Sequence, residues 1–496
     1  MNSPTPPQLN TPLQKVSESP KPADAQKVKK KSAPAETFYI TTAIDYVTDL
    51  PHIGHAYEKT AADILTRYWR RRGRNVFFLT GTDEHGLKVA QAAQKKGQEV
   101  REFVENIALK YKATWSAIEI KYDNFIRTTD PEHEKYVQQF VQKLYDMGEI
   151  YKDRYQGLYC VGCEEYKTVS ELLPGNTCSV HKTLCQAVFE DVYFFRLSKY
   201  QEKILDIIQS GKMLVEPVER RNEIISFLTK QPLQDLAMSR SKVSWGILVP
   251  WDTSQTIYVW IDALLNYITG SRGNWPPSLQ LIGKDIFRFH CIIWPALLMA
   301  MGYELPRKIL IHGFLTINGE RISKTTGNTI DPLQIVKMYG VDPLRYFLFR
   351  EVPFGQDGDF SVDRFEKRYK SDLANDLGNL VQRVLTMAVK YNIKWEYKTI
   401  TKPFHQIDQA IEDLKFDKAL ELIWDMITES NQKIDLEKPW QLENNPKKLT
   451  EIISQLLQTL SQIAFQIDPF MPETSWAIIE QLKSRKAYVI FPRKNK

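Results

Sequence analysis

The first residues that could do chemistry are two histidines in the motif Pro51-His52-Ile53-Gly54-His55, which lies just before an expected helix. Backbone N–H groups and the positive end of the helix dipole attract anions at such a position. Gly54 has no Cβ, so a ligand can approach the backbone closely. His52 and His55 could then donate hydrogen bonds to phosphate oxygens during phosphoryl or nucleotidyl transfer. The alternative is that both histidines only cap a turn, because short motifs also match by chance.

A second motif is the glycine-flanked basic loop from Gly319 to Asn328, with the sequence GERISKTTGN. Lys324 offers a compact positive charge, and Arg321 offers a planar guanidinium for polyphosphate oxygens. Alone, such a loop is more often a solvated turn. Combined with the histidine motif in one α/β fold, it favours a mobile phosphate clamp. The catalytic residues predicted from both motifs are His52, His55, Arg321 and Lys324.

Cysteines supply a third candidate site. The chain has five, and Cys160-X-X-Cys163 followed by Cys178-X-X-His181 offers four soft or borderline ligands in two pairs. This spacing predicts one structural Zn²⁺ with tetrahedral ligands. Reduced cysteines without metal are the alternative, and Cys185 lies close enough to replace His181 as the fourth ligand. The odd number of cysteines fits a reducing compartment better than a disulfide framework.

The elements that must position these motifs indicate a Rossmann-like α/β fold. An apolar strand at Phe38 to Thr42, a helix from about Ala56 to Arg72 and a strand at Val76 to Thr80 form a right-handed crossover unit. A mononucleotide-binding parallel sheet follows from this order. Further short apolar segments predict a second half of the same sheet. They are Ile257 to Ile261, Gln280 to Gly283 and Lys308 to His312.

After Asp357 the apolar residues follow helical spacing instead. One predicted helix face contains Leu373, Leu377, Leu380, Val384 and Met387. A second predicted helix contains Ile407, Ile411, Leu414, Leu422 and Met426. The predicted domains are a tail at 1–36, a first catalytic half at 37–152, an insertion with the zinc site at 153–253, a second catalytic half at 254–356 and an all-α bundle at 357–496.

Composition limits the classes that remain. The 496 residues are too many for one ordinary core. A hydrophobic content of 43% and a charged content of 25% are typical of soluble globular proteins, so no membrane partner is expected. The net charge of +6 permits a nucleic-acid partner without requiring one. The lysine-containing tail lacks hydrophobic periodicity and is expected to be disordered. A transit peptide is the alternative, but the tail has no arginine, which favours a cytoplasmic location.

The two phosphate motifs resemble the paired signatures of class I aminoacyl-tRNA synthetases. Other segments resemble the methionyl-tRNA synthetases in particular. They are Thr80 to Gly86, Tyr258 to Ala263, Gly283 to His290 and Trp294 to Ala296. The resemblance extends from about Phe38 to Pro472. It implies activation of L-methionine by ATP to methionyl-adenylate, release of pyrophosphate, and transfer of methionine to tRNA(Met).

The resemblance also implies binding residues. Those for methionine are Ile44, Tyr46, Asp83, Trp260, Ala263, Tyr267, Ile286 and His290. Aromatic walls suit a thioether, and Asp83 would hold the substrate ammonium. Those for ATP are His52, Gly54, His55, Asp285, Ser323, Lys324 and Thr325, with Mg²⁺ on the polyphosphate. The alternative for any one aromatic residue is a place in the core.

Reading of the tRNA is expected in the helix bundle. Asn375, Asn379 and Arg383 follow each other at helical spacing, and Trp440 offers a platform for an unstacked base. By resemblance, Asn379, Arg383 and Trp440 match the anticodon-reading positions. A polar helix face and a core tryptophan are the alternative. A monomer is expected, because no dimerisation module follows the bundle in this sequence.

Some positions depart from the family pattern. Asp45 stands where tyrosine is usual, and a carboxylate there would repel ATP phosphates unless it points away. Arg321-Ile322 replaces the usual Lys-Met. Further departures are Ala43 for proline, Thr48 for asparagine and Leu264 for a proline found in many members.

Two kinds of rival function remain. Class I synthetases for leucine, isoleucine or valine would need a larger editing insertion, and a cysteine enzyme would place metal ligands at the substrate site. A non-catalytic tRNA-binding paralogue is the rival of another class. The presence of His52, His55 and Lys324 argues against it.

Overall fold

The computed structural model describes residues 37–162, 165–167, 172–180, 182–322, 328–398 and 404–493. The predicted tail at 1–36, the metal-ligand candidates Cys163 and His181, and residues 323–327 of the basic loop lie outside these ranges.

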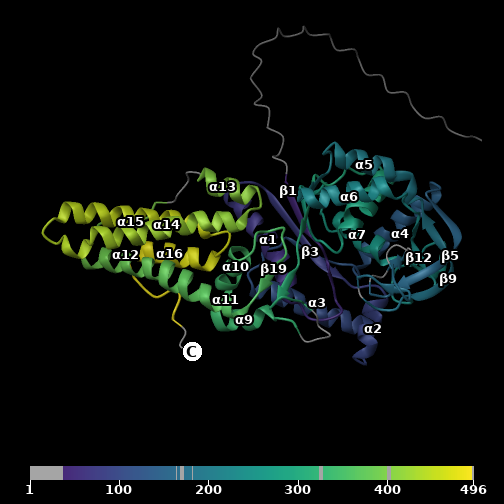
Figure 1. The fold of residues 1–496 in the computed structure, drawn as a ribbon, viewed down its shortest axis with the longest axis horizontal. Helices are drawn as coiled ribbons and strands as arrows, with labels where there is room; N and C mark the ends of the chain where they lie inside the picture. Colours follow the sequence, from purple (N-terminus) through teal and green to yellow (C-terminus); the bar gives the residue numbers. More distant parts are fainter. Residues whose placement is uncertain are drawn as a thin grey trace, which may run out of the picture. The chain divides into compact units, whose positions relative to one another are not determined.

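A parallel sheet lies at the centre of the described chain (Figure 1). Its strands are β1 (Phe38–Thr42), β2 (Asp45–Tyr46), β3 (Val76–Asp83), β4 (Asn124–Arg127), β10 (Leu214–Glu216), β15 (Leu279–Gly283) and β16 (Lys308–His312). Their order is β10-β16-β15-β1-β3-β2, with β4 also paired to β3, and every pairing is parallel. From the boundary between β1 and β15, the sheet continues through β3 and β2 on one side and through β16 and β10 on the other. The direction in which strands are added to the sheet therefore changes at this boundary. Such a switch point opens a crevice at the carboxyl ends of the strands. The predicted fold class is confirmed.

Alternate residues of the central strands face two separate hydrophobic cores, as the two-residue period of a strand requires. Ile40 and Phe78 belong to one core, which also contains residues of α1 (Ile53–Arg71). Tyr39 and Leu79 belong to the other, which contains residues of α7 (Val259–Thr269). Helices thus cover both faces, which is the normal environment of a parallel sheet.

One expected strand of the second half is wrong. β14 (Asp252–Ile257) ends where the predicted strand Ile257 to Ile261 begins, and α7 starts at Val259. β14 pairs antiparallel with β12 (Ser239–Arg240) and β13 (Leu248–Val249), outside the parallel sheet. The start of α7 is buried on all sides, and a short apolar run does not distinguish a buried helix from a buried strand.

The segment predicted as an insertion begins with a long antiparallel pair, β5 (Ile150–Cys160) and β9 (Gln186–Phe195). Four short strands accompany it: β6 (Glu165–Lys167), β7 (Leu172–Leu173), β8 (Thr177–Cys178) and β11 (Leu236–Ala237). Two helices follow, α5 (Gln201–Gln209) and α6 (Val218–Lys230). Between them β10 joins β16 at the edge of the parallel sheet, so this segment also contributes to the central fold. The predicted domain boundaries stay a prediction.

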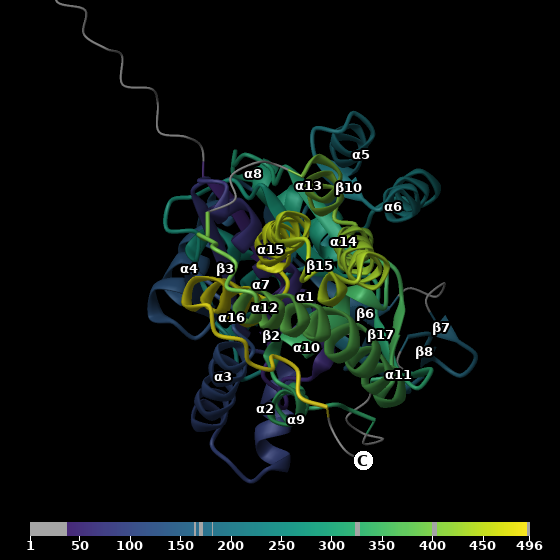
Figure 2. The same ribbon diagram turned by 90° about the vertical axis from the view of Figure 1, so that its left-hand side faces the viewer.

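Long helices near the end of the chain pack side by side as a bundle (Figures 1 and 2). They are α12 (Asn379–Lys390), α14 (Phe416–Glu437), α15 (Pro446–Ile467) and α16 (Pro472–Ser484). The first predicted face runs from a π-helical turn (Tyr369–Gly378) into α12, and its members are buried except for half-buried Met387. The second predicted helix is wrong as a single element. α13 (His405–Glu412) ends before Leu414, whose φ of 63° is left-handed and breaks the helix.

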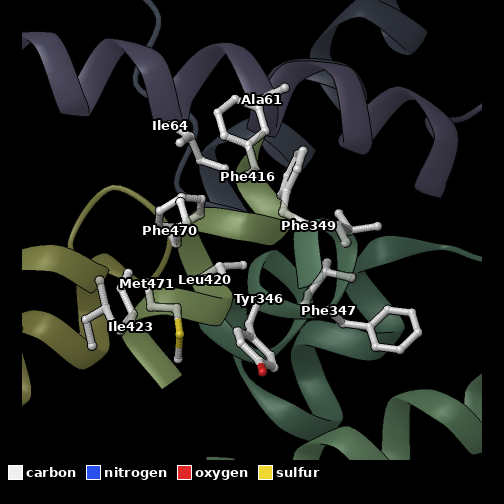
Figure 3. Close-up of a cluster of buried hydrophobic side chains, with 14 of the residues drawn as sticks. Ala61, Ile64, Tyr346, Phe347, Phe349, Phe416, Leu420, Ile423, Phe470 and Met471 are labelled. Atoms are coloured by element: carbon white, nitrogen blue, oxygen red, sulfur yellow. The ribbon is translucent and has the colours of Figure 1, made fainter. Parts of the chain in front are cut away.

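The bundle packs onto α1 and α10 (Val341–Arg350) through an aromatic core (Figure 3). The ring of Phe416 lies 5.3 Å from that of Phe349 and 6.1 Å from that of Phe470. Beside them the buried guanidinium of Arg345 lies 2.6 Å from the Asp63 carboxylate of α1. The helix α1, which begins with the histidine motif, therefore packs against the parallel sheet on one face and against α10 and the bundle on the other.

The remaining elements connect these layers. They are α2 (Leu87–Lys95), α3 (Val100–Ala117), α4 (Pro131–Asp146), α8 (Trp294–Ala300), α9 (Pro332–Tyr339), α11 (Val362–Arg368), β17 (Leu315–Ile317), β18 (Glu320–Arg321) and β19 (Gly358–Phe360). Across the described residues, we find no helix long and apolar enough to span a bilayer.

Candidate active site

A cavity of about 390 Å³ opens at the carboxyl ends of four adjacent strands. Its wall includes Ala43 after β1, Asp83 at the end of β3, Gly283 at the end of β15 and His312 at the end of β16. The cavity therefore lies at the switch point of the sheet, where ligands bind in folds of this kind.

The two histidines of the first motif begin α1 and line this cavity. Nδ1 of His52 accepts from the backbone N–H of Gly54 (3.1 Å), and Nδ1 of His55 accepts from the backbone N–H of His52 (3.2 Å). The rings stack with centroids 3.8 Å apart. Because Nδ1 is an acceptor in both residues, the neutral rings carry their proton at Nε2. The histidines thus cap the helix and also present N–H donors at the site.

Both ends of the basic loop reach this helix start. A Cβ at Gly54 would lie only 3.4 Å from Cδ1 of Ile322, which is the residue before the undescribed part of the loop. On its far side, the carbonyl of Ile330 accepts from the backbone N–H of Ile53 (3.0 Å). Ser323, Lys324 and Thr325 lie outside the described residues. Their described neighbours, Ile322 and Ile330, both lie beside the histidine motif.

All the residues that the resemblance assigned to methionine line the same cavity: Ile44, Tyr46, Asp83, Trp260, Ala263, Tyr267, Ile286 and His290. The Trp260 ring stacks on Phe289 at 3.7 Å, and Tyr46 meets Trp260 edge-on at 6.4 Å. The buried Asp83 lies opposite Tyr46 in the β2–β3 pair. An apolar, aromatic wall with one carboxylate at its edge suits an amino acid with an uncharged side chain.

His290 is held neutral in this wall. Its Nδ1 lies 3.0 Å from the carbonyl of Ile286 and its Nε2 lies 2.7 Å from the Tyr267 hydroxyl. Burial lowers the pKa of His290 to about 4. The Tyr267 hydroxyl is therefore the donor to Nε2.

Several buried polar atoms around the cavity have no hydrogen-bond partner within the described part of the chain. They are Tyr57 Oη, Trp260 Nε1, Asn266 Oδ1 and His312 Nε2. Buried polar groups are normally bonded, so these atoms indicate a polar ligand. Sequence reasoning missed Tyr57, Asn266 and His312. Only His312 had a signal, because it ends a predicted strand of a parallel sheet.

Asp285 follows β15 and lines the cavity. A Cβ at Gly283 would lie 2.8 Å from its Oδ1, so glycine allows the carboxylate to approach the strand end.

Next to the aromatic wall of the cavity lies a buried histidine and aspartate network that the sequence did not reveal. Asp262 lies 2.8 Å from Nδ1 of His85 and 2.7 Å from Nε2 of His133. Burial opposes a charge on His85, but Asp262 outweighs it and raises the pKa of His85 to about 10. A charged imidazolium therefore compensates the buried carboxylates at this end of the site.

The cysteines of the third motif gather in one small cluster. Cys160, Cys178 and Cys185 are all buried and pack together. Burial raises the pKa of the Cys185 thiol, and its neighbours Cys160 and Cys178 raise it further. Among the described residues, no three side chains are arranged as a metal site. Two predicted ligands, Cys163 and His181, lie outside those residues. The three clustered thiols are of the type that binds a soft metal ion.

Two of the anticodon candidates lie together on the bundle. The guanidinium of Arg383 lies 6.0 Å from the ring centroid of Trp440, and it also pairs with Asp435 (2.7 Å). Trp440 is 44% exposed, so it is not a core residue. Asn379 is exposed at the start of α12.

The parallel sheet, the histidines at its switch point and the adjoining basic loop define a class I aminoacyl-tRNA synthetase. In agreement, the family model described as "tRNA synthetases class I (M)" matches residues 38–172 and 167–385. The methionine–tRNA ligase of Caldanaerobacter subterraneus is 44% identical over 90% of this chain and 74% of its own length. That of Streptomyces coelicolor is 41% identical over 90% of both chains. The chain belongs to the methionyl-tRNA synthetase family.

Solved structures agree with this assignment. Mycobacterium tuberculosis methionyl-tRNA synthetase in complex with methionyl-adenylate has a TM-score of 0.84 and 36% identity, covering 92% of this chain and 99% of that one. The free state of the same enzyme has a TM-score of 0.77 and 33% identity, covering 93% and 99%.

Proposed function

We propose that the protein activates L-methionine with ATP, releases pyrophosphate and transfers methionine to tRNA(Met). The observation that carries this proposal is the convergence on one cavity of the histidine motif, Ile322 at the start of the basic loop and the residues expected to bind methionine. The similarity to an adenylate complex supports the same reaction.

Methionine binds with its thioether against the aromatic wall and neutral His290. Sulfur contacts aromatic rings favourably, and an uncharged wall disfavours charged side chains. The carboxylate of Asp83 holds the substrate ammonium, since a buried charge requires a partner. This leaves the substrate carboxylate directed toward the nucleotide.

ATP binds across the switch point, with its ribose near Asp285 and its phosphates at the start of α1. The Nε2 donors of His52 and His55 stabilise charge on the phosphates, and Arg321 and Lys324 hold the pyrophosphate. Gly54, Ser323 and Thr325 complete the phosphate site. Mg²⁺ shields the polyphosphate when bound. These groups promote the reaction by positioning the substrates and stabilising charge, because the protein forms no covalent bond to the substrate in transfers of this kind.

The reaction proceeds in two displacements. A carboxylate oxygen of methionine bonds to the α-phosphorus while the bond from that phosphorus to the bridging oxygen breaks, and pyrophosphate leaves. A hydroxyl of the terminal adenosine of tRNA then attacks the methionyl carbonyl, and AMP leaves. Asn379, Arg383 and Trp440 read the anticodon, with the indole as a stacking surface.

Cys160 and Cys178 would supply two thiolates to one structural Zn²⁺, and Cys163 with either His181 or Cys185 would supply the other two ligands. The bound ion would stabilise the β5–β9 region. A cytoplasmic location and a monomeric state stay predictions.

Pyrophosphate exchange tests the proposal. Purified protein is assayed for ATP–pyrophosphate exchange with each proteinogenic amino acid in turn, and only methionine is expected to support it. Lys324→Ala is expected to lower exchange by roughly a hundredfold or more, as for the loss of other groups that stabilise developing charge. Lys308→Ala is the control, because this lysine pairs with Glu216 away from the cavity. Exchange with another amino acid, or none, would reject the proposal and favour a rival synthetase or a non-catalytic paralogue.

A further inference from the structure

A fully buried lysine lies beside the cavity, one turn after the histidine motif on α1. Lys59 is 0% exposed. Its Nζ donates to the carbonyl of Ala43 (2.9 Å), to Oδ1 of Asp45 (2.7 Å) and to Oε2 of Glu58 (3.2 Å). An ammonium has three N–H donors, so this geometry uses all of them inside the protein.

These contacts fix the segment that joins β1 to β2. Lys59 binds the carbonyl of Ala43, and the backbone N–H of Ala43 donates to Oε1 of Glu58 (2.8 Å). Ile44 and Tyr46, two residues of the methionine wall, lie in the same segment. The position of that wall relative to the histidine helix therefore depends on two adjacent side chains of α1.

The same lysine balances charge at the site. Asp45 and Glu58 line the cavity together with Asp285 and Asp83, while the phosphates and the methionine carboxylate are anionic. Asp45 stands where tyrosine is usual in the family, so the carboxylate is an additional charge in this chain. Burial disfavours the charged form of Lys59, but Asp45 and Glu58 outweigh it and raise its pKa, which keeps the ammonium charged. Burial raises the pKa of Glu58, and Lys59 counteracts part of that rise.

We propose that Lys59 is a positioning residue for methionine activation, which orients the Ala43–Tyr46 segment and cancels the Asp45 carboxylate so that the nucleotide can bind. This role rests on the proposed function. It acts through Asp45, Glu58 and the backbone, without contact to the reacting atoms.

Lys59→Met is expected to raise the KM for ATP in methionine-dependent exchange by about tenfold or more, since the variant removes the ammonium from two buried carboxylates. The defect should shrink as the pH falls from 9 to 6, because a carboxylate without its cation has a higher pKa and becomes protonated. Charged and titratable groups facing this cluster are Asp83, Asp285, His312, Tyr111 and Tyr267. The double variant Asp45→Asn/Lys59→Met should recover most of the affinity for ATP and lose the pH dependence.

Arg67→Met is the matched control. Arg67 lies on the same helix and pairs with Asp63 (2.6 Å), but it does not line the cavity. This variant should lower the melting temperature without changing the KM for ATP or its pH profile. A purely structural role for Lys59 would give the same pattern as Arg67.

The outcomes separate this role from the function. If the wild-type protein shows no methionine-dependent exchange, the proposed function fails and this role with it. If the wild type is active while Lys59→Met keeps the wild-type KM for ATP and pH profile, only the role of Lys59 is rejected. If Lys59→Met does not fold, the KM for ATP of Asp45→Asn tests the role of Lys59 instead. It keeps the ammonium on Ala43 and Glu58 and should lower the KM for ATP about threefold, on the scale of a partly screened charge, whereas a raised KM would overturn the proposal.

Discussion

The Tyr267 hydroxyl lies 2.7 Å from Nε2 of His290, in the wall of the cavity. His290 is tied through Nδ1 to the carbonyl of Ile286, so the pair has one arrangement in which Tyr267 donates. With the pKa of His290 lowered to about 4 by burial, the ring stays neutral at physiological pH. The wall that would face the methionine thioether therefore contains a polar pair without net charge.

Tyr267→Phe should weaken methionine binding. The change removes the donor to Nε2 and leaves a buried acceptor unsatisfied, which costs about 1–3 kcal/mol. The KM for methionine should rise roughly 5- to 150-fold, while the KM for ATP changes little. Pyrophosphate exchange at varied methionine concentration measures both. Tyr391→Phe is the control, because its hydroxyl meets Glu443 on the exposed bundle surface. An unchanged KM for methionine in Tyr267→Phe would contradict the assignment of this wall.

His85 should make stability depend on pH. Its pKa of about 10 in the folded protein exceeds the value of about 6.5 for free histidine. The stabilisation is therefore complete below pH 6.5 or so and is lost as the pH rises toward 10, by up to about 1.4 kcal/mol per pH unit. Urea unfolding at several pH values measures it. The slope should be smaller in His85→Gln and unchanged in the exposed control His405→Gln. Equal slopes in all three proteins would show that Asp262 does not hold His85 charged.

Sequence reasoning worked best where a local pattern decides the structure. The strands at Phe38–Thr42 and Lys308–His312 have the predicted bounds, because each is an apolar run of strand length between two neighbours in a parallel sheet. It failed at Ile257 to Ile261, where the same kind of run starts a buried helix. It also failed at Leu414, because the helices on both sides of this turn face one core and keep the apolar spacing.

The cavity shows a similar division. The histidine motif and the family resemblance indicated His52, His55 and the residues expected to bind methionine, and all of them line one cavity. No motif could indicate how Asp45 is compensated, because the answer is a contact with Lys59 on the next helix. Asn266 and Tyr57 were also missed, since each lies within an otherwise apolar helix face and reaches the cavity only through the packing of α7 and α1 on the sheet.

Arg345→Met should destabilise the junction between α1 and the bundle. The guanidinium is fully buried and binds the Asp63 carboxylate and the carbonyls of Pro469 and Phe470. Removing one partner of a buried ion pair costs about 3–5 kcal/mol, because the other charge remains buried. The free energy of unfolding in urea measures this loss. Arg154→Met removes a pair that is largely exposed and should cost less than about 1 kcal/mol. Similar losses in both variants would contradict a special role for the junction.

Metal analysis should find one zinc per chain. Cys178→Ser should abolish binding, because Cys178 belongs to the buried thiol cluster, whereas Cys291→Ser should keep it, because Cys291 belongs to a different core. Separate His181→Asn and Cys185→Ser variants identify the fourth ligand as the one whose loss releases the metal. Chelation should lower the melting temperature, since a structural ion contributes folding energy. Metal-free protein with unchanged stability would reject the site.

Trp440 and Arg383 should matter for tRNA and not for amino-acid activation. Stacking of a base on an aromatic side chain contributes about 1–3 kcal/mol, so Trp440→Ala should lower kcat/KM for aminoacylation roughly 5- to 150-fold. Methionine-dependent pyrophosphate exchange should stay at the wild-type level, because the indole lies on the bundle rather than at the cavity. Trp476→Ala is the matched control, since this tryptophan is 67% exposed on α16.

Arg383→Met should give a loss of the same kind, and the double variant should lose less than the sum of the two. The guanidinium lies 6.0 Å from the Trp440 ring, so the two side chains form one surface and their effects couple. Aminoacylation assays of the two single variants and the double variant measure this coupling. If Trp440→Ala and Trp476→Ala reduced aminoacylation equally, general exposure of tryptophan on the bundle would explain the result, and the anticodon surface would have to lie elsewhere.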